Sequence, residues 1–113
     1  MKIGFESMEE KVLPNFKGGE KEYRAFMFDD ENNKIMKGKL IPGASIGYHK
    51  HEGTSEIIFI ISGKGRVLYD DTEENVCPGD CHYCPEGHSH SLINDSDEDL
   101  IFFAAVPVHR GGK

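Results

Sequence analysis

The residues best suited to chemistry lie close together, between positions 49 and 56. His49 and His51 are two residues apart, so their imidazoles point to the same face of a β-strand. The next four residues, 52–55, include Gly, Thr and Ser and are typical of a turn that would return Glu56 toward both histidines. His90 is a fourth candidate, supplied by a later stretch. Two imidazoles and a carboxylate converging on one point suit a divalent metal ion, so the sequence predicts a metal site within β-structure.

These residues belong to a longer pattern with two parts. The first part is a glycine, five residues, His-x-His, four residues, a glutamate, six residues and a glycine, with its fixed positions at Gly43, His49, His51, Glu56 and Gly63. The second part begins after the spacer 64–78, with its fixed positions at Gly79, Pro85, Gly87, His90 and Asn94. The pattern resembles the two motifs of the cupin family, complete and in order. The resemblance covers residues 43–94 firmly and the flanking strands loosely.

The resemblance implies a small single-domain cupin. The expected fold is all-β, a double-stranded β-helix or jelly-roll barrel, with one metal held by His49, His51, Glu56 and His90. Neutral imidazole and carboxylate ligands accommodate Mn, Fe, Co, Ni, Cu or Zn, so the sequence predicts one divalent transition metal of undetermined identity. Four protein ligands on an ion that prefers five or six leave a position for water or substrate. The alternative is a cupin that has lost its metal, but converging ligands are costly to bury without an ion.

Four more side chains near the motifs could take part in the chemistry of the site. Tyr48 and Tyr83 are candidate catalytic residues, whose hydroxyls would move protons near a bound substrate; the alternative is packing with a polar tip. His82 and His88 flank the site in sequence. Such histidines are more often hydrogen-bond partners of the ligands, or residues of the rim, than ligands themselves.

The three cysteines, Cys77, Cys81 and Cys84, are an odd number in a chain that shows no export signal. Free thiols in a reducing compartment are therefore expected, and the predicted location is cytoplasmic. Cys81 and Cys84 have the C-x-x-C spacing of some metal and redox sites, but no second ligand pair or thioredoxin-like context accompanies them. A packing role is favoured for both, because cysteine behaves as a small apolar residue.

A series of short strands must position these residues. Alternating or apolar runs separated by turn residues predict strands at 23–28, 35–41, 45–51, 55–62, 66–70, 75–77, 80–84, 88–93 and 100–108. No stretch has a sustained helical period, so little helix is expected. Residues 1–20 show mixed apolar spacing and are interpreted as an irregular N-terminal arm with one helical turn. Residues 21–110 form a single β-barrel domain in this interpretation.

Two of the predicted strands are apolar on both faces. If Glu56 points into the barrel, Ile58 and Ile60 do so too, and Phe59 points outward; the run 100–106 has the same character. An outward face of this kind is an unusually large apolar patch for a monomer. The N-terminal arm and a second subunit are both expected to cover it, so a homodimer is predicted.

Composition narrows the possible partners. The net charge of −7 disfavours a nucleic-acid surface, which would require clustered Lys and Arg, and no stretch is long and apolar enough to cross a membrane. The class of partner that remains is a small-molecule ligand or substrate.

The favoured function is a metal-dependent enzyme with dioxygenase-, isomerase- or epimerase-like chemistry. The alternatives are a binding module for a small ligand or a metal, and a structural dimer with a vestigial site.

Overall fold

The computed structural model describes residues 1–110. In this range the strands are β1 (Lys11–Pro14), β2 (Glu22–Asp29), β3 (Asn33–Leu40), β4 (His49–Lys50), β5 (Glu56–Ser62), β6 (Gly65–Tyr69), β7 (Thr72–Val76), β8 (Cys81–Cys84), β9 (Ser89–Ile93) and β10 (Leu100–Pro107). The helical elements of the same range are two 3-10 turns, η1 (Phe5–Ser7) and η2 (Phe16–Gly18). The all-β prediction with little helix is therefore confirmed.

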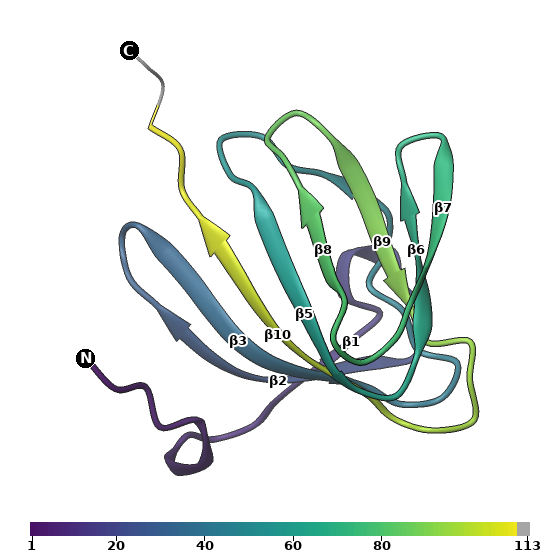
Figure 1. The fold of residues 1–113 in the computed structure, drawn as a ribbon. Coiled ribbons are helices and arrows are strands. Elements are labelled where there is room, and N and C mark those ends of the chain that lie inside the picture. Colours follow the sequence, from purple (N-terminus) through teal and green to yellow (C-terminus); the bar gives the residue numbers. More distant parts are fainter. Residues whose placement is uncertain (111–113) are drawn as a thin grey trace.

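Two antiparallel sheets face each other. Within the described residues, the larger sheet has the order β1-β2-β3-β10-β5-β8 and the smaller one has the order β4-β9-β6-β7. Figure 1 shows the larger sheet from β2 to β8, with β9, β6 and β7 opposite it. The chain crosses between the sheets several times, so strands distant in sequence become neighbours; β10, for example, pairs with both β3 and β5. This is the jelly-roll arrangement that the sequence predicts.

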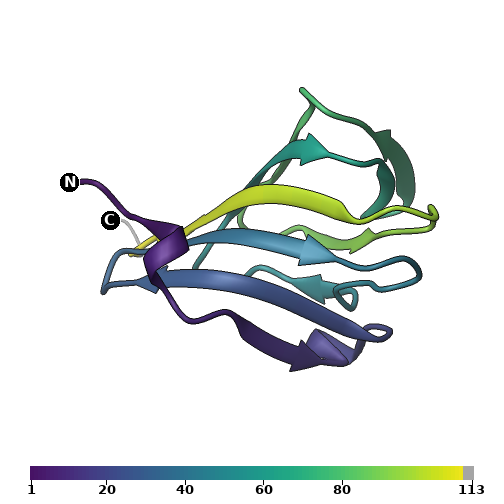
Figure 2. The ribbon, with the colours of Figure 1, turned by 90° about the horizontal axis from the view of Figure 1, so that it is seen from below.

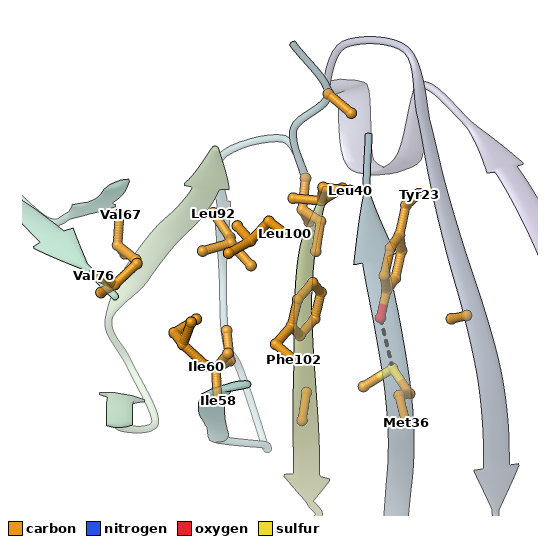
Figure 3. Packing of buried hydrophobic residues seen from close by; sticks show 14 residues of the cluster. Tyr23, Met36, Leu40, Ile58, Ile60, Val67, Val76, Leu92, Leu100 and Phe102 are labelled. Atoms are coloured by element: carbon orange, nitrogen blue, oxygen red, sulfur yellow. Dashed lines mark hydrogen bonds between the residues drawn. The ribbon is translucent and has the colours of Figure 1, made fainter. Parts of the chain in front are cut away.

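The core consists of alternate residues on the inward strand faces. On β5, Ile58 and Ile60 are buried, whereas Phe59 and Ile61 are exposed, as predicted. Figure 3 shows side chains from both sheets meeting in this core, with Phe102 of β10 in the middle. Because a strand alternates its faces, burial of these residues also fixes which face Glu56 occupies.

The N-terminal arm has more structure than the sequence suggests. It contains β1, which pairs with β2 at the edge of the larger sheet (Figure 2). Its η2 turn packs against Gly47, whose backbone N–H donates to the carbonyl of Phe16 at 3.0 Å. A Cβ at Gly47 would overlap the carbonyl oxygen of Lys17, so only glycine allows this approach. The sequence predicts an irregular arm with one helical turn, whereas the structure has a strand and two 3-10 turns there, because tertiary pairing orders segments that lack local periodicity.

The predicted strand at 45–51 is also shorter than expected. Only His49–Lys50 is a strand, and Ser45 makes an isolated bridge to Ile93. The backbone N–H groups of Ser45 and Gly47 donate to carbonyls of the arm. These two groups are therefore not available for regular pairing with another strand. Among residues 1–110, no helix has the length and apolar character needed to cross a membrane.

Candidate metal centre

Three strand ends bring four side chains to one point. His49 opens β4 and lies directly opposite His90 of β9 in the smaller sheet. His51 follows β4 immediately, and Glu56 is the first residue of β5 in the larger sheet. The bend at 52–55 joins the two, as the sequence predicts. The group therefore lies at one end of the barrel, between the sheets.

The ligand atoms of this group are close together. The Nε2 atom of His51 lies 3.2 Å from that of His49 and 3.0 Å from that of His90. The Glu56 Oε1 atom lies 3.2 Å from His51 Nε2 and 2.9 Å from His90 Nε2. One ligand atom from each of the four residues lies within 4.8 Å of all the others.

The other ring nitrogen of each histidine has its own partner. His49 Nδ1 lies 2.7 Å from the carbonyl of Gly47, and His51 Nδ1 lies 2.8 Å from the hydroxyl of Thr54. His90 Nδ1 lies 3.0 Å from Nε2 of the buried His82. Because a carbonyl only accepts, His49 Nδ1 carries a proton and its Nε2 offers a lone pair to the centre. These partners hold the rings so that Nε2 faces the cluster in each case.

Burial and hydrogen bonding set the charges of the group. Burial lowers the pKa of His49, which favours the neutral imidazole that a metal requires. Burial would raise the pKa of Glu56, but its contacts with the His51 and His90 imidazoles outweigh burial and lower that pKa to about 2. Glu56 is therefore an ionised carboxylate at neutral pH.

This donor set fits a transition-metal ion. Ligand atoms about 2.0–2.1 Å from a common ion stand about 2.8–3.4 Å apart, from the octahedral to the tetrahedral angle. The observed separations of 2.9–3.2 Å match this range. Neutral imidazole nitrogens this close repel one another unless a proton or a cation lies between them. The group can therefore hold a metal ion.

A cavity of about 310 Å³ opens beside the cluster. His49, His51 and Glu56 form part of its wall. The rest of the wall combines apolar, polar and charged residues; these are Phe16, Lys17, Tyr23, Met27, Lys34, Met36, Ile46, Lys50, Glu52, Thr54 and Val106. A ligand in this space could contact an ion held by the four side chains.

The two-sheet fold, the paired motifs and the three histidines with one glutamate agree with a family comparison. The model of the cupin domain matches residues 36–106. The chain belongs to the cupin family. The match includes the four candidate ligands and most of both sheets.

Relatives of this cupin differ in the functions that their names give. An oxalate-binding protein from Thermotoga maritima is 37% identical over 101 residues, which cover 83% of each chain. A glucose-6-phosphate isomerase from Thermococcus onnurineus is 35% identical over 69 residues, but these cover 57% of this cupin and 36% of the isomerase. The crystal structure of a predicted oxalate decarboxylase from T. maritima superposes with a TM-score of 0.89 at 28% identity, covering 96% of this cupin and 99% of that chain.

The structure does not bring Tyr48 and Tyr83 to the cavity of this cupin. Their exposed fractions are 52% and 53%, and neither belongs to the cavity wall. The Tyr48 hydroxyl donates to the carbonyl of Asp70 at 3.3 Å, and Tyr83 pairs with Ile57 on the outward face of the larger sheet. The expected proton-transfer role at the site thus lacks the necessary geometry. Strand alternation explains the position of Tyr83, because its neighbour His82 takes the inward face.

The two flanking histidines behave as hydrogen-bond partners. His82 is buried and contacts His90, whereas His88 lies toward the outside, 2.6 Å from a carboxylate oxygen of Asp70 and 3.3 Å from the Tyr69 hydroxyl. Neither belongs to the ligand group in the described part of the chain. Register thus gives the two histidines different surroundings.

The cavity also contains residues that the sequence reasoning missed. Tyr23 of β2 is buried in its wall, and its hydroxyl contacts the Met36 sulfur at 3.4 Å (Figure 3). Burial, with a smaller effect from Glu56, raises the pKa of Tyr23, so the phenol stays neutral. Lys17 and Lys34 come from the arm and from β3. No local motif marks these residues, since they reach the site only through the pairing of distant segments.

The cysteines are free thiols, as expected for Cys77, Cys81 and Cys84. Cys84 is buried, and burial raises the pKa of its thiol to about 12, whereas Cys81 is exposed. Among residues 1–110, neither belongs to a cluster that could hold a metal. Cys84 thus has the packing role that the sequence favours.

Proposed function

We propose that this cupin binds a small carboxylate of the oxalate type at a metal held by His49, His51, Glu56 and His90. The observation that carries the proposal is the cavity beside the four ligands, whose wall includes three lysines. A divalent ion there would supply a positive, Lewis-acidic centre for carboxylate or carbonyl oxygens. The oxalate-binding relative from T. maritima, 37% identical, supports this choice of ligand.

The cavity wall fits a small anion better than a neutral sugar. Lys17, Lys34 and Lys50 carry three positive charges against two negative charges, on Glu52 and on the ligand Glu56. Such a rim attracts anions although the whole chain has a net charge of −7. The volume of about 310 Å³ is near the lower limit of ordinary ligand pockets, so the ligand is small.

Catalysis on the bound molecule is the second candidate, and Tyr23 favours it. Tyr23 belongs to the cavity wall, and the contact of its hydroxyl, the thioether of Met36, is a weak acceptor. The hydroxyl could therefore donate to a ligand oxygen and orient it. An oxalate decarboxylase would convert hydrogen oxalate to formate and CO₂. Dioxygenase, isomerase or epimerase chemistry on another small polar molecule belongs to the same proposal.

Titration calorimetry with oxalate tests the binding proposal. We expect oxalate to bind the manganese-loaded protein and not the metal-free protein, with acetate as a single-carboxylate control. Lys34→Gln should weaken binding by about 1.5- to 5-fold, the range of an exposed charge pair. Lys37→Gln is the matched control, because Lys37 is exposed on the same strand and lies outside this cavity. Equal binding with and without metal, or none with metal, would refute the proposal.

The same samples separate a binder from an enzyme. Formate, CO₂ and oxygen uptake would be measured over long incubation of the metal-loaded protein with oxalate, and then with sugar phosphates and keto-enols. Tight binding with no turnover assigns a binding module. Turnover that is lost in His90→Ala assigns an enzyme.

The homodimer is part of the proposal. Phe59, Ile61 and Phe103 are exposed apolar residues on the outward face of the larger sheet. Phe5 of the arm contacts Phe103, with ring centroids 5.8 Å apart, but Phe59 stays exposed. A second copy would cover what the arm leaves open. Sedimentation at micromolar concentration tests this proposal, and a monomer in that experiment would refute the dimer.

The cytoplasmic location stays a prediction.

A further inference from the structure

Three side chains form a hydrogen-bonded chain from the surface to the metal centre. Glu74 of β7 has an oxygen 2.9 Å from Nδ1 of His82, which lies on β8. The Nε2 atom of His82 lies 3.0 Å from Nδ1 of His90, which lies on β9. Both histidine side chains are buried, whereas 42% of the Glu74 side chain is exposed. The chain thus links solvent to one of the four proposed ligands.

The outer partner, Glu74, determines which atom donates and which accepts in each of these hydrogen bonds. A carboxylate only accepts hydrogen bonds, so His82 Nδ1 carries a proton and donates it to Glu74. The Nε2 atom of neutral His82 then has a lone pair and accepts from His90 Nδ1–H. The proton on Nδ1 leaves a lone pair on His90 Nε2, the atom that lies 3.0 Å from His51 Nε2. That lone pair is what a metal requires.

Without Glu74, the opposite direction would be favoured, because the Glu56 carboxylate lies 2.9 Å from His90 Nε2 and accepts only from a proton on that atom. His82 could donate from Nε2 to His90 Nδ1, which would place the proton of His90 on Nε2 and block metal binding. His49 has no such ambiguity, because the Gly47 carbonyl fixes its tautomer from within the same segment. His90 depends instead on a residue of another strand.

We propose that Glu74, acting through His82, selects the metal-binding tautomer of His90 and thereby strengthens metal binding. Both are positioning residues that do not touch the metal. The inference rests on the metal site of the proposed function, but its first step concerns the metal-free protein alone. The pair also spans the two sheets, since β7 belongs to the smaller sheet and β8 to the larger one.

Nitrogen-15 NMR of the metal-free protein tests the tautomer directly, at a pH where the histidines are neutral. We expect His90 to be protonated on Nδ1 in the wild type. Glu74→Ala should populate the form protonated on Nε2, whereas Glu74→Gln should retain the wild-type form because its amide oxygen can still accept. Glu73→Ala is the matched control, since Glu73 is adjacent on the same strand and pairs with Arg66. Exposure of the Glu74 side chain makes these variants compatible with folding.

Zinc affinity, measured by competition with a chelator, tests the consequence. Loss of an outer partner of a metal ligand typically weakens affinity about 10- to 100-fold, and we expect this for Glu74→Ala. In His82→Gln the amide can replace Nε2 as the acceptor, so adding Glu74→Ala to it should have no further effect. An unchanged tautomer or an unchanged zinc affinity in Glu74→Ala would overturn the inference. A wild type that bound no zinc would overturn the proposed function, while the tautomer comparison would still decide the role of Glu74.

Discussion

The inward face of each central strand is polar at one end of the barrel and apolar at the other. On β5, Glu56 belongs to the ligand group, and Ile58 and Ile60 belong to the core. On β9, His90 is followed two residues later by Leu92 of the core. The same alternation buries both ends, but different forces hold them. The apolar end is stabilised by area removed from water, and the polar end by hydrogen bonds and, as proposed, by an ion.

This difference implies that the two ends can be weakened separately. Removal of a ligand should abolish metal binding and leave the apolar packing in place. Removal of a core side chain should lower the free energy of unfolding and leave the ligand set in place. Four predictions test this separation, from the largest expected effect to the smallest.

His90→Ala should have the largest effect, on metal binding. It removes one of the four ligands, so the loss of affinity should exceed the 10- to 100-fold expected for an outer partner. The thermal stabilisation given by added metal should disappear with it. Elemental analysis and melting curves with and without zinc measure both. His88→Ala is the control, because His88 lies two residues away and outside the ligand group; full metal retention in His90→Ala would contradict the ligand assignment.

Phe102→Ala should have the largest effect on folding. Phe102 has an exposed fraction of 0%, and truncation of a buried Phe to Ala costs about 3–5 kcal/mol of unfolding free energy. Urea unfolding measures the loss, and metal stoichiometry in the folded fraction should not change. Phe103→Ala, one residue along β10 with an exposed fraction of 38%, should cost clearly less. Equal losses would contradict the inward and outward assignment.

Acid should destabilise the metal-free protein in two stages. Burial lowers the pKa of His49 and of His82 below the ordinary 6.5, so the unfolded state binds their protons more readily. Their contribution to stability is present above about pH 6.5 and is lost as the pH falls below it. Glu56, with its pKa lowered from 4.5 to about 2, contributes above pH 4.5 and loses this contribution as the pH falls toward 2.

Urea midpoints across this pH range measure both stages. Bound metal should be released in the first stage, because protons compete for the imidazole nitrogens. Metal content that stayed constant down to about pH 4 would point instead to a site without essential histidines.

Tyr23→Phe should have the smallest effect on stability. Tyr23 lies at the border between the two ends, because it belongs both to the apolar core and to the cavity wall. The hydroxyl contacts only a weak acceptor within the described structure, so its loss should cost at most about 0.5–1.5 kcal/mol. Oxalate affinity should fall if the hydroxyl contacts the ligand. A wild-type affinity with unchanged turnover would exclude Tyr23 from the site.

Local patterns in the sequence were enough to predict the all-β class and most strands. The alternation of Ile58 and Phe59 assigns the inward face of β5, because the strand period is two and does not depend on what lies opposite. The His-x-His spacing, the turn before Glu56 and the second motif with His90 also identify the four residues that the structure brings together. Each of these signals depends on near neighbours in the chain or on motif spacing.

Only the tertiary structure decided what surrounds those four residues. Tyr23 and Lys34 reach the cavity from β2 and β3, and Glu74 meets His82 across the two sheets. Tyr48 looked equally suitable in the sequence, but it faces outward beside Asp70. The two-residue period of a strand predicts which side of the sheet a residue faces. It does not predict which distant strand lies across from that residue. That second choice depends on how the crossovers bring the two sheets together, so it appears only in the folded chain.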